Sequence, residues 1–341
     1  MRHVNIPIFI PHLGCPHACA FCNQRLISGV DDFDPNSVSE TIERVLSTVT
    51  PQDEVEIAFF GGSFTAIERE RMIALLEIGA SYVDSGRVRS LRSSTRPDAI
   101  NPEIVSILKQ YGMTTVEIGV QSVSDAVLLA TSRGHTRADI EYALTLLRQS
   151  GIKTVGQMMI GLPNATLSDE EETLRAMIDL GVDAVRIYPT VVFLGTELHR
   201  MALDGRYTPL SVDEAVERGA RLLQILDGTG VVALRIGLCA TDGLSDSDTV
   251  FGGAYHPALG EMIKSRYFYY KLKQKIQQAS PSAHLTVFVP RGALSQAIGH
   301  KKMNKRLLMA EFSLQTLDFC EREGLVDCEI SLLMERKIPC T

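Results

Sequence analysis

Three closely spaced cysteines are the residues of this sequence whose types and spacing most clearly imply chemistry. Cys15, Cys19 and Cys22 lie in the stretch "HLGCPHACAFCN" in the order C-x3-C-x2-C. An iron–sulfur cubane is normally held by four cysteine thiolates, so three thiolates would leave one iron open to an exchangeable ligand. A structural zinc ion also needs four ligands, and His12 or His17 could supply the fourth. The spacing alone leaves both interpretations open.

A second group of polar and glycine positions comes at or just after strand-like segments. Carboxyl ends of parallel strands meet at one edge of a sheet or barrel, where catalytic residues gather. The cysteine stretch directly follows the first strand-like segment, so we expect these residues to share its edge. The group consists of Gly61, Gly62, Ser63, Ser94, Gln121, Arg133 and Gln157.

The elements that must position these residues alternate between strand-like and helix-like segments. Such alternation predicts βαβ units, a parallel sheet and right-handed crossovers. We therefore expect an α/β fold, a partial or complete (β/α) barrel over residues 1–230. Ser168 is the expected N-cap of the last of these helices. The expected strands are 5–10, 54–60, 87–94, 114–120, 153–162 and 183–192, and the expected helices are 37–49, 68–83, 102–112, 136–151 and 168–181.

The cysteine spacing, with Phe21 before the last cysteine, resembles the signature of radical S-adenosylmethionine (SAM) enzymes. The resemblance implies a 4Fe-4S cluster on Cys15, Cys19 and Cys22, with SAM on the open iron. Reductive cleavage of SAM would give a 5′-deoxyadenosyl radical that abstracts hydrogen from a substrate. It also implies a partial TIM-like barrel and places Phe21 near the adenine.

The same resemblance implies roles for the residues at the strand ends. Gly61, Gly62 and Ser63 match the glycine-rich motif that binds the amino group of the methionine moiety. Gln121 and Arg133 match positions that bind the ribose or carboxylate, and Gln157 falls on the segment that contacts adenine. Ser94 stands where related enzymes commonly have glutamate, which is a departure from the family pattern.

The segment "VDAVRIYPTVVFLGTELHR" is more similar to the Elongator catalytic-subunit group than to oxygen-independent coproporphyrinogen oxidases. The similarity extends over about residues 5–220 and implies RNA, such as a tRNA base, as substrate. It places Tyr188 inside the barrel as a candidate catalytic residue. We find no acetyl-CoA pattern after residue 230, so only the radical half of that group's chemistry is expected.

The amino-acid composition of the sequence changes after residue 230. Residues 231–262 are rich in glycine, aspartate and serine and are expected to form an ordered linker, whose His256 and Glu261 are further candidate catalytic residues. Residues 263–341 are expected to form a small α+β domain, with one helix running over 303–324 and a strand over 326–334.

Within this domain, "RGALSQAIGHKKMNKRLLMAEF" resembles the helix–turn–helix core of KH RNA-binding domains. A KH loop reads GXXG and clamps the nucleic-acid backbone, and here Lys302 replaces the second glycine. The implied RNA-binding residues are Gly299, Lys301, Lys302, Lys305 and Arg306.

The overall composition and charge exclude few classes of function. The formal net charge is −7, so nothing global favours a nucleic-acid or membrane partner. No signal peptide or membrane span is evident, so a cytoplasmic enzyme is expected, reduced by a donor such as flavodoxin or ferredoxin. Two alternatives remain: the same radical chemistry on a small metabolite, and an RNA-binding protein with a structural cluster.

Overall fold

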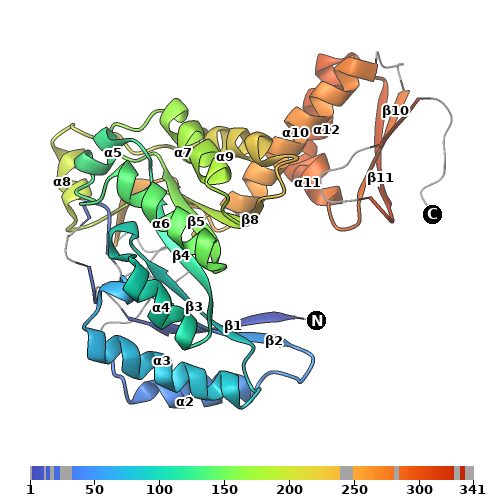
Figure 1. Ribbon diagram of the computed structural model, residues 1–341. Helices are drawn as coiled ribbons and strands as arrows, with labels where there is room; N and C mark the ends of the chain where they lie inside the picture. Colours follow the sequence, from blue (N-terminus) through green and yellow to red (C-terminus); the bar gives the residue numbers. More distant parts are fainter. Residues whose placement is uncertain are drawn as a thin grey trace.

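A curled, wholly parallel sheet organises the first 240 residues of this computed structural model (Figure 1). The structure describes residues 2–10, 13–15, 19–23, 33–238, 249–279, 284–325 and 331–334. The strand order is β1-β2-β3-β4-β5-β6-β8, every neighbouring pair is parallel, and the sheet curls into a half-barrel. The strands are β1 (His3–Phe9), β2 (Glu54–Phe60), β3 (Ser90–Thr95), β4 (Met113–Gln121), β5 (Lys153–Ile160), β6 (Ala184–Pro189) and β8 (Val232–Ile236).

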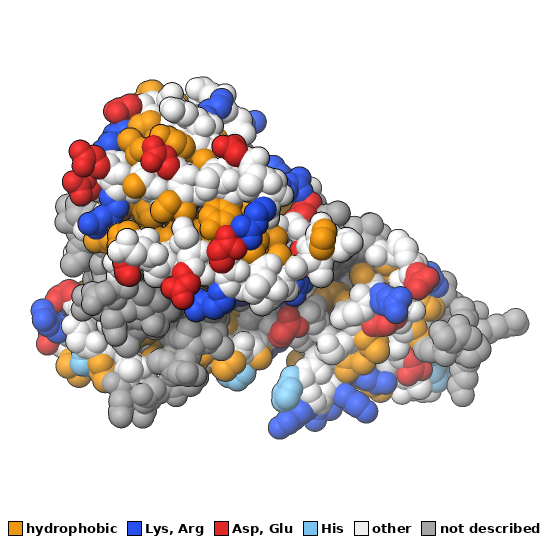
Figure 2. Space-filling model, turned by 90° about the horizontal axis from the view of Figure 1, so that it is seen from below, with side chains coloured by type: hydrophobic (Ala, Val, Ile, Leu, Met, Phe, Trp, Pro, Cys, Tyr) orange, Lys and Arg blue, Asp and Glu red, His pale blue; other side chains and the backbone are white. Residues whose placement is uncertain are grey.

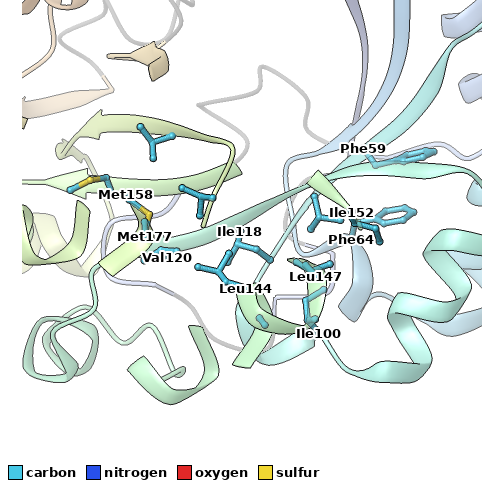
Figure 3. Packing of buried hydrophobic residues seen from close by; sticks show 14 of the residues in the cluster. Phe59, Phe64, Ile100, Ile118, Val120, Leu144, Leu147, Ile152, Met158 and Met177 are labelled. Carbon is cyan, nitrogen blue, oxygen red and sulfur yellow. The ribbon is translucent and has the colours of Figure 1, made fainter. Parts of the chain in front are cut away.

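Helices connect these strands and cover the outer, convex face of the sheet (Figure 1). These helices bury the side chains on one face of each strand, because successive side chains of a strand point to opposite faces of the sheet. In Figure 3, Ile118 and Val120 of β4 lie beside Leu144 and Leu147 of α6 in this core. The helices are α2 (Ser37–Leu46), α3 (Arg69–Asp84), α4 (Pro102–Gln110), α5 (Asp125–Ala130), α6 (Arg137–Ser150), α7 (Leu167–Asp179), α8 (Glu197–Leu203) and α9 (Val212–Leu226).

The expected α/β half-barrel is therefore confirmed, with one addition. The segment 231–262, expected to be a linker, supplies the seventh strand β8, and β9 (Val250–Gly253), which pairs antiparallel with β7 (Val191–Phe193). The short strand β8 was not predicted because the sequence that follows "VALRI" is rich in glycine and aspartate, which are typical of loops.

The C-terminal unit stands to one side of the half-barrel and is reached through the long helix α10 (Leu259–Ala279) (Figure 1). Its sheet has the order β11-β10-β12, with β10 and β11 parallel and β12 antiparallel. The expected helix over 303–324 is wrong in its second half, which is strand β11. Besides α10, the elements are β10 (His284–Pro290), α11 (Leu294–Ile298), α12 (Met303–Glu311), β11 (Thr316–Arg322) and β12 (Ser331–Met334).

None of the helices in the described part of the chain combines the length and apolar character needed to span a membrane.

Candidate active site at the strand ends

The cysteine loop lies directly against the glycine-rich loop after β2. Ile10 N–H donates to Phe60 O at 2.7 Å, and Ser63 N–H donates to Leu13 O at 3.0 Å. A Cβ atom on Gly62 would overlap the carbonyl oxygen of Leu13. Only a residue without a side chain permits this approach, so the glycine predicted for cofactor contact also seats the cysteine loop.

Two of the three thiols are close enough to influence each other electrostatically. Burial raises the pKa of the Cys15 thiol and the Cys19 charge raises it further, whereas Arg133 and Arg96 act in the opposite direction. The Ser63 side chain hydrogen-bonds Cys15 as well. Cys22 N–H donates to Cys19 O at 3.0 Å, which closes a tight turn. His12 and His17, the alternative zinc ligands, lie outside the described residues.

The residues inside this turn are anchored to neighbouring elements. Ala20 N–H donates to Thr131 O after α5 at 2.9 Å, and Ala20 O accepts from Leu198 N–H of α8 at 2.8 Å. Phe21 packs into a small apolar cluster with Val192, Leu198 and Tyr207. The position predicted to lie near adenine is thus half-buried against β7 and α8.

Arg133 is a basic residue in direct contact with this loop. Its Nη1 donates to Cys19 Sγ at 3.3 Å and its Nη2 donates to Gly119 O at 2.9 Å. Its Nε is buried without a partner. A buried guanidinium with a spare donor suits an anionic group nearby.

Gln121 and Gln157 form a reciprocal amide pair across β4 and β5. Each Nε2 donates to the other residue's Oε1, at 3.0 and 2.9 Å. Gln121 has a left-handed φ of +64°, and the β4–β5 register shifts at this point. The two amide side chains therefore lie together near the ends of β4 and β5, and their role in cofactor binding stays a prediction.

The concave face of the half-barrel carries a row of charged residues that sequence reasoning missed. Arg92 donates to Glu56 at 3.3 Å and to Glu117 at 2.7 Å. Arg186 donates to Glu117 at 3.0 Å and to the Tyr188 hydroxyl at 3.4 Å. The available signal was one charged residue within each of the strand segments β3, β4 and β6, together with Glu56 of β2, because burying a charge in an apolar core is costly unless it is paired.

Tyr188 lies at the end of this charged row, and its pKa is raised by burial. Ser94 of β3 shares the concave face, since its register partner is Glu117. Gly61 has a φ of +98°, which favours glycine at the turn after β2. The concave face therefore carries charged side chains within the strands, and glycines, amide side chains and thiols at the ends of the strands.

Sequence comparison identifies the family. The pattern of the radical SAM superfamily matches residues 9–177, and that of the radical SAM C-terminal domain matches residues 182–268. The chain belongs to the radical SAM superfamily. It is therefore a radical SAM enzyme, with a 4Fe-4S cluster and SAM as cofactors.

The most informative relatives are Elongator-like. The chain is 29% identical over 244 residues to a tRNA uridine(34) acetyltransferase of Methanocaldococcus infernus, which covers 60% of this chain and 46% of that protein. It is 34% identical over 194 residues to human Elongator complex protein 3, covering 51% of this chain and 36% of that protein. The chain thus spans less than half the length of these relatives.

A relative of more similar length is an uncharacterised protein of Methanocaldococcus jannaschii, 30% identical over 62% of this chain and 68% of that protein. Among solved structures, archaeal Elp3 of M. infernus superposes with a TM-score of 0.61 at 23% identity, covering 82% of this chain and 63% of that one. This likeness supports the fold.

The residues of this radical SAM enzyme fit the two cofactors. Thiolates are the ligands an iron–sulfur cluster requires, and two of the three cysteines already influence each other's ionisation. Arg133 Nε and Arg96 Nη1 are buried donors without partners, as expected beside an anionic cluster or carboxylate. Within the described ranges, no three His, Cys, Asp or Glu side chains form a ready-made metal site.

Arg96 and His135 complete the surroundings of Arg133, and neither was among the predicted site residues. Arg96 is almost fully buried and its Nε and Nη2 donate to Asp98 at 2.9 and 3.0 Å. His135 shares a hydrogen bond with Val120 O at 3.3 Å, and its Nδ1 has no partner. Two cations and one carboxylate therefore lie behind the cysteine loop.

The contacts of the other two predicted catalytic residues lead away from this cluster. His256 is exposed, and its Nδ1 accepts from Ala258 N–H at 3.0 Å just before α10. Glu261 is exposed, ion-pairs with Lys264 of α10 at 3.4 Å and accepts from Gln296 of α11 at 2.6 Å. These contacts cap α10 and fix α11 to it.

The predicted RNA-binding residues lie around the loop between α11 and α12. Lys301, Lys302 and Arg306 are exposed, whereas Lys305 is half-buried and ion-pairs with Asp318 at 3.5 Å. Figure 2 shows lysine, arginine and histidine side chains gathered at one edge of the smaller lobe. Gly299 is buried and has a φ of +80°.

Proposed function

We propose that this radical SAM enzyme modifies RNA, with its cluster on Cys15, Cys19 and Cys22. The observation that carries the RNA assignment is the exposed basic loop of residues 300–302 in an otherwise acidic chain. The name of the M. infernus relative, a tRNA uridine(34) acetyltransferase, supports tRNA as the substrate class.

Different residues at the strand ends bind different parts of the two cofactors. Gly61, Gly62 and Ser63 present backbone groups to the amino end of SAM, and Arg133 supplies positive charge beside the thiolates. The Gln121–Gln157 pair offers amide groups to the ribose and adenine. When bound and reduced by one electron, the cluster would cleave SAM to methionine and a 5′-deoxyadenosyl radical, which is the chemistry needed to abstract a hydrogen atom.

The charged row on the concave face would then receive the reacting group of the substrate. Tyr188 lies closest to the strand ends among its members, and burial raises its pKa further above neutrality, so the phenol is protonated at neutral pH. A protonated phenol donates a hydrogen bond to an oxygen acceptor, such as a base carbonyl. Tyr188 is the residue of this row to which we assign substrate contact.

The backbone of the basic loop supports a clamp for nucleic acid. Lys301 and Lys302 have left-handed φ values of +49° and +60°, the conformation that glycine adopts most readily. Asn304 fixes the loop from behind, because its Nδ2 donates to Ser265 O at 2.8 Å and to Ala297 O at 3.1 Å. The lysine side chains therefore start from a fixed backbone and extend into solvent, where they can meet phosphates.

The decisive test is RNA-dependent radical chemistry. The full chain is reconstituted anaerobically with iron and sulfide, reduced with dithionite, and incubated with SAM in the presence and absence of total tRNA. We expect 5′-deoxyadenosine release and a new modified nucleoside only with tRNA. Release that is independent of tRNA but stimulated by a metabolite extract would favour the small-molecule alternative.

The basic loop is tested separately by RNA binding. We expect Lys301→Ala/Lys302→Ala to weaken tRNA binding and to reduce the slope of log K against log salt by about 1.4, as expected for two lost phosphate contacts at about 0.7 each. Lys153→Ala is the matched control, since Lys153 is an exposed lysine at the first position of β5, outside the loop. Equal binding by the double variant and the parent would remove the loop from the interface.

We further propose that flavodoxin or ferredoxin supplies the electron and that the enzyme works in the cytoplasm. Comparison of both carriers with dithionite, as sources of the electron for 5′-deoxyadenosine release, tests the first point.

A further inference from the structure

The hydrogen bond between Arg133 and Cys19 joins a buried cation to a cysteine that we assign to the cluster. Arg133 is 8% exposed and Cys19 is 9% exposed, so water screens this contact only weakly. The Nη1–Sγ distance is 3.3 Å, within the range for a hydrogen bond to sulfur.

The backbone around Arg133 holds the guanidinium in this orientation. Arg133 N–H donates to Leu128 O at 2.9 Å, and Nη2 donates to Gly119 O at 2.9 Å. A Cβ atom on Gly119 would lie 2.6 Å from Nη2, so a side chain there would displace the guanidinium. Gly119 therefore creates the space in which Arg133 reaches the sulfur.

A donor in this position affects the two redox states of a cluster unequally. One-electron reduction adds a negative charge to the cluster, and part of that charge resides on the cysteine sulfurs. Hydrogen bonds to these sulfurs and nearby net charge are among the features that set cluster potentials. A fixed N–H donor with positive charge, in a dehydrated site, stabilises the more negative state more strongly.

We propose that Arg133 is a positioning residue that raises the reduction potential of the cluster through Cys19. This inference rests on the proposed role of Cys19 as a cluster ligand. It adds to the cofactor-binding role expected for Arg133, because the contact is to a proposed cluster ligand and not to SAM. Gly119 is the second residue on which this effect depends, because its lack of a side chain leaves space for the Arg133 guanidinium.

The test is a redox titration of the reconstituted full chain without SAM, followed by the electron paramagnetic resonance signal of the reduced cluster. For Arg133→Met we expect the equilibrium constant for one-electron reduction to fall about tenfold, equivalent to ~59 mV. Arg133→Lys, which keeps the charge, should shift the potential less. Gly119→Ala should shift it in the same direction as Arg133→Met, although the charge remains.

Arg137→Met is the matched control. Arg137 is half-buried at the start of α6 and pairs with Glu141 and Glu172, so the variant should titrate like the parent. Iron content and circular dichroism are measured for every variant. If Arg133→Met does not fold, Arg133→Lys and Gly119→Ala still decide the question.

An unchanged potential in the folded variants that carry full iron would overturn the proposal. A potential that changes only after SAM is added would do so as well, and would leave Arg133 with cofactor binding alone. Failure of the ligand assignment has a different signature, because Cys19→Ala would then retain full iron and the parent spectrum.

Discussion

Single charged residues, more than apolar ones, define the inside of this half-barrel. Glu117 ion-pairs with Arg92 at 2.7 Å and with Arg186 at 2.9 Å, and both side chains of the first pair are 7% exposed. Removing one partner of a buried pair leaves an uncompensated charge, which is far more costly than breaking an exposed pair. The concave face is thus ordered by its own ion pairs before any substrate arrives.

His135 offers a residue-level prediction about pH. Burial, together with Arg133 and Arg96, lowers its pKa from 6.5 to about 3. Between these values the unfolded chain binds a proton that the folded chain does not, so stability falls as the pH decreases from about 6.5. For His135→Gln we expect this part of the pH dependence to disappear. The variant should lose about 2 kcal/mol less unfolding free energy than the parent between pH 7 and pH 5.

Urea denaturation at pH 5, 6 and 7 measures this difference. His284→Gln is the control, because His284 is exposed and lies in the C-terminal unit. Parallel pH profiles for the parent and His135→Gln would show that His135 does not titrate as its burial implies.

At the scale of single residues, the sequence predicted the parts of the site that belong to a local pattern. The cysteine triplet was singled out by its spacing, whereas the glycines after β2, Gln121 and Gln157 were assigned through the resemblance to radical SAM enzymes, and these assignments stay predictions. Arg96 and Gly119 could not be assigned in this way, because their roles depend on contacts with Asp98 and Arg133 made only by the folded chain. A glycine within a strand gives no sign of which side chain will approach it.

At the scale of elements, helix and strand types were predicted better than their ends. Helix α7 begins after Thr166 rather than at the expected cap Ser168, because Thr166 and Asp169 form a reciprocal capping box. Strand β11 was predicted as helix because "LQTLDFCERE" has no turn residue before it apart from Ser313. Ser313 adopts a φ of +52°, and this backbone turn, which the sequence does not announce, ends the helical segment.

The packing of α9 against α10 gives an element-level prediction. A Cβ atom on Gly219 would lie 2.5 Å from Cδ1 of Ile263, which is fully buried. Overpacking costs about 1–3 kcal/mol, whereas replacing glycine by alanine within a helix gains about 1 kcal/mol. Because three atoms of Ile263 crowd the site, we expect Gly219→Ala to lower the unfolding free energy by about 1 kcal/mol.

A double-mutant cycle isolates this contact. In an Ile263→Ala background the obstruction is gone, so Gly219→Ala should become stabilising by about 1 kcal/mol through helix propensity. Gly252→Ala is the control, since no atom lies within 4 Å of a Cβ atom placed there. The same sign for Gly219→Ala in both backgrounds would contradict the close approach of the two helices.

At the scale of the whole molecule, α10 belongs to two hydrophobic cores. Leu259 and Ile263 pack into the half-barrel core, whereas Phe268, Leu272 and Ile276 pack into the core of the C-terminal unit. Ion pairs on the same helix reinforce the junction, and Lys271 contacts Asp227 at 3.1 Å. The helix therefore fixes the position of the basic loop relative to the half-barrel.

This arrangement predicts that a substitution within α10 can abolish tRNA binding while the half-barrel still binds its cofactors. Leu272 is fully buried in the second core, so Leu272→Ala should destabilise the C-terminal unit by about 2–5 kcal/mol. The half-barrel core does not contain Leu272, so iron content and SAM binding should be retained while tRNA binding is lost. Gln274→Ala, an exposed change two residues later, should stay within about 0.5 kcal/mol of the parent. Calorimetry should show the variant melting in two steps, and a single cooperative transition with simultaneous loss of iron would mean that the two cores fold as one.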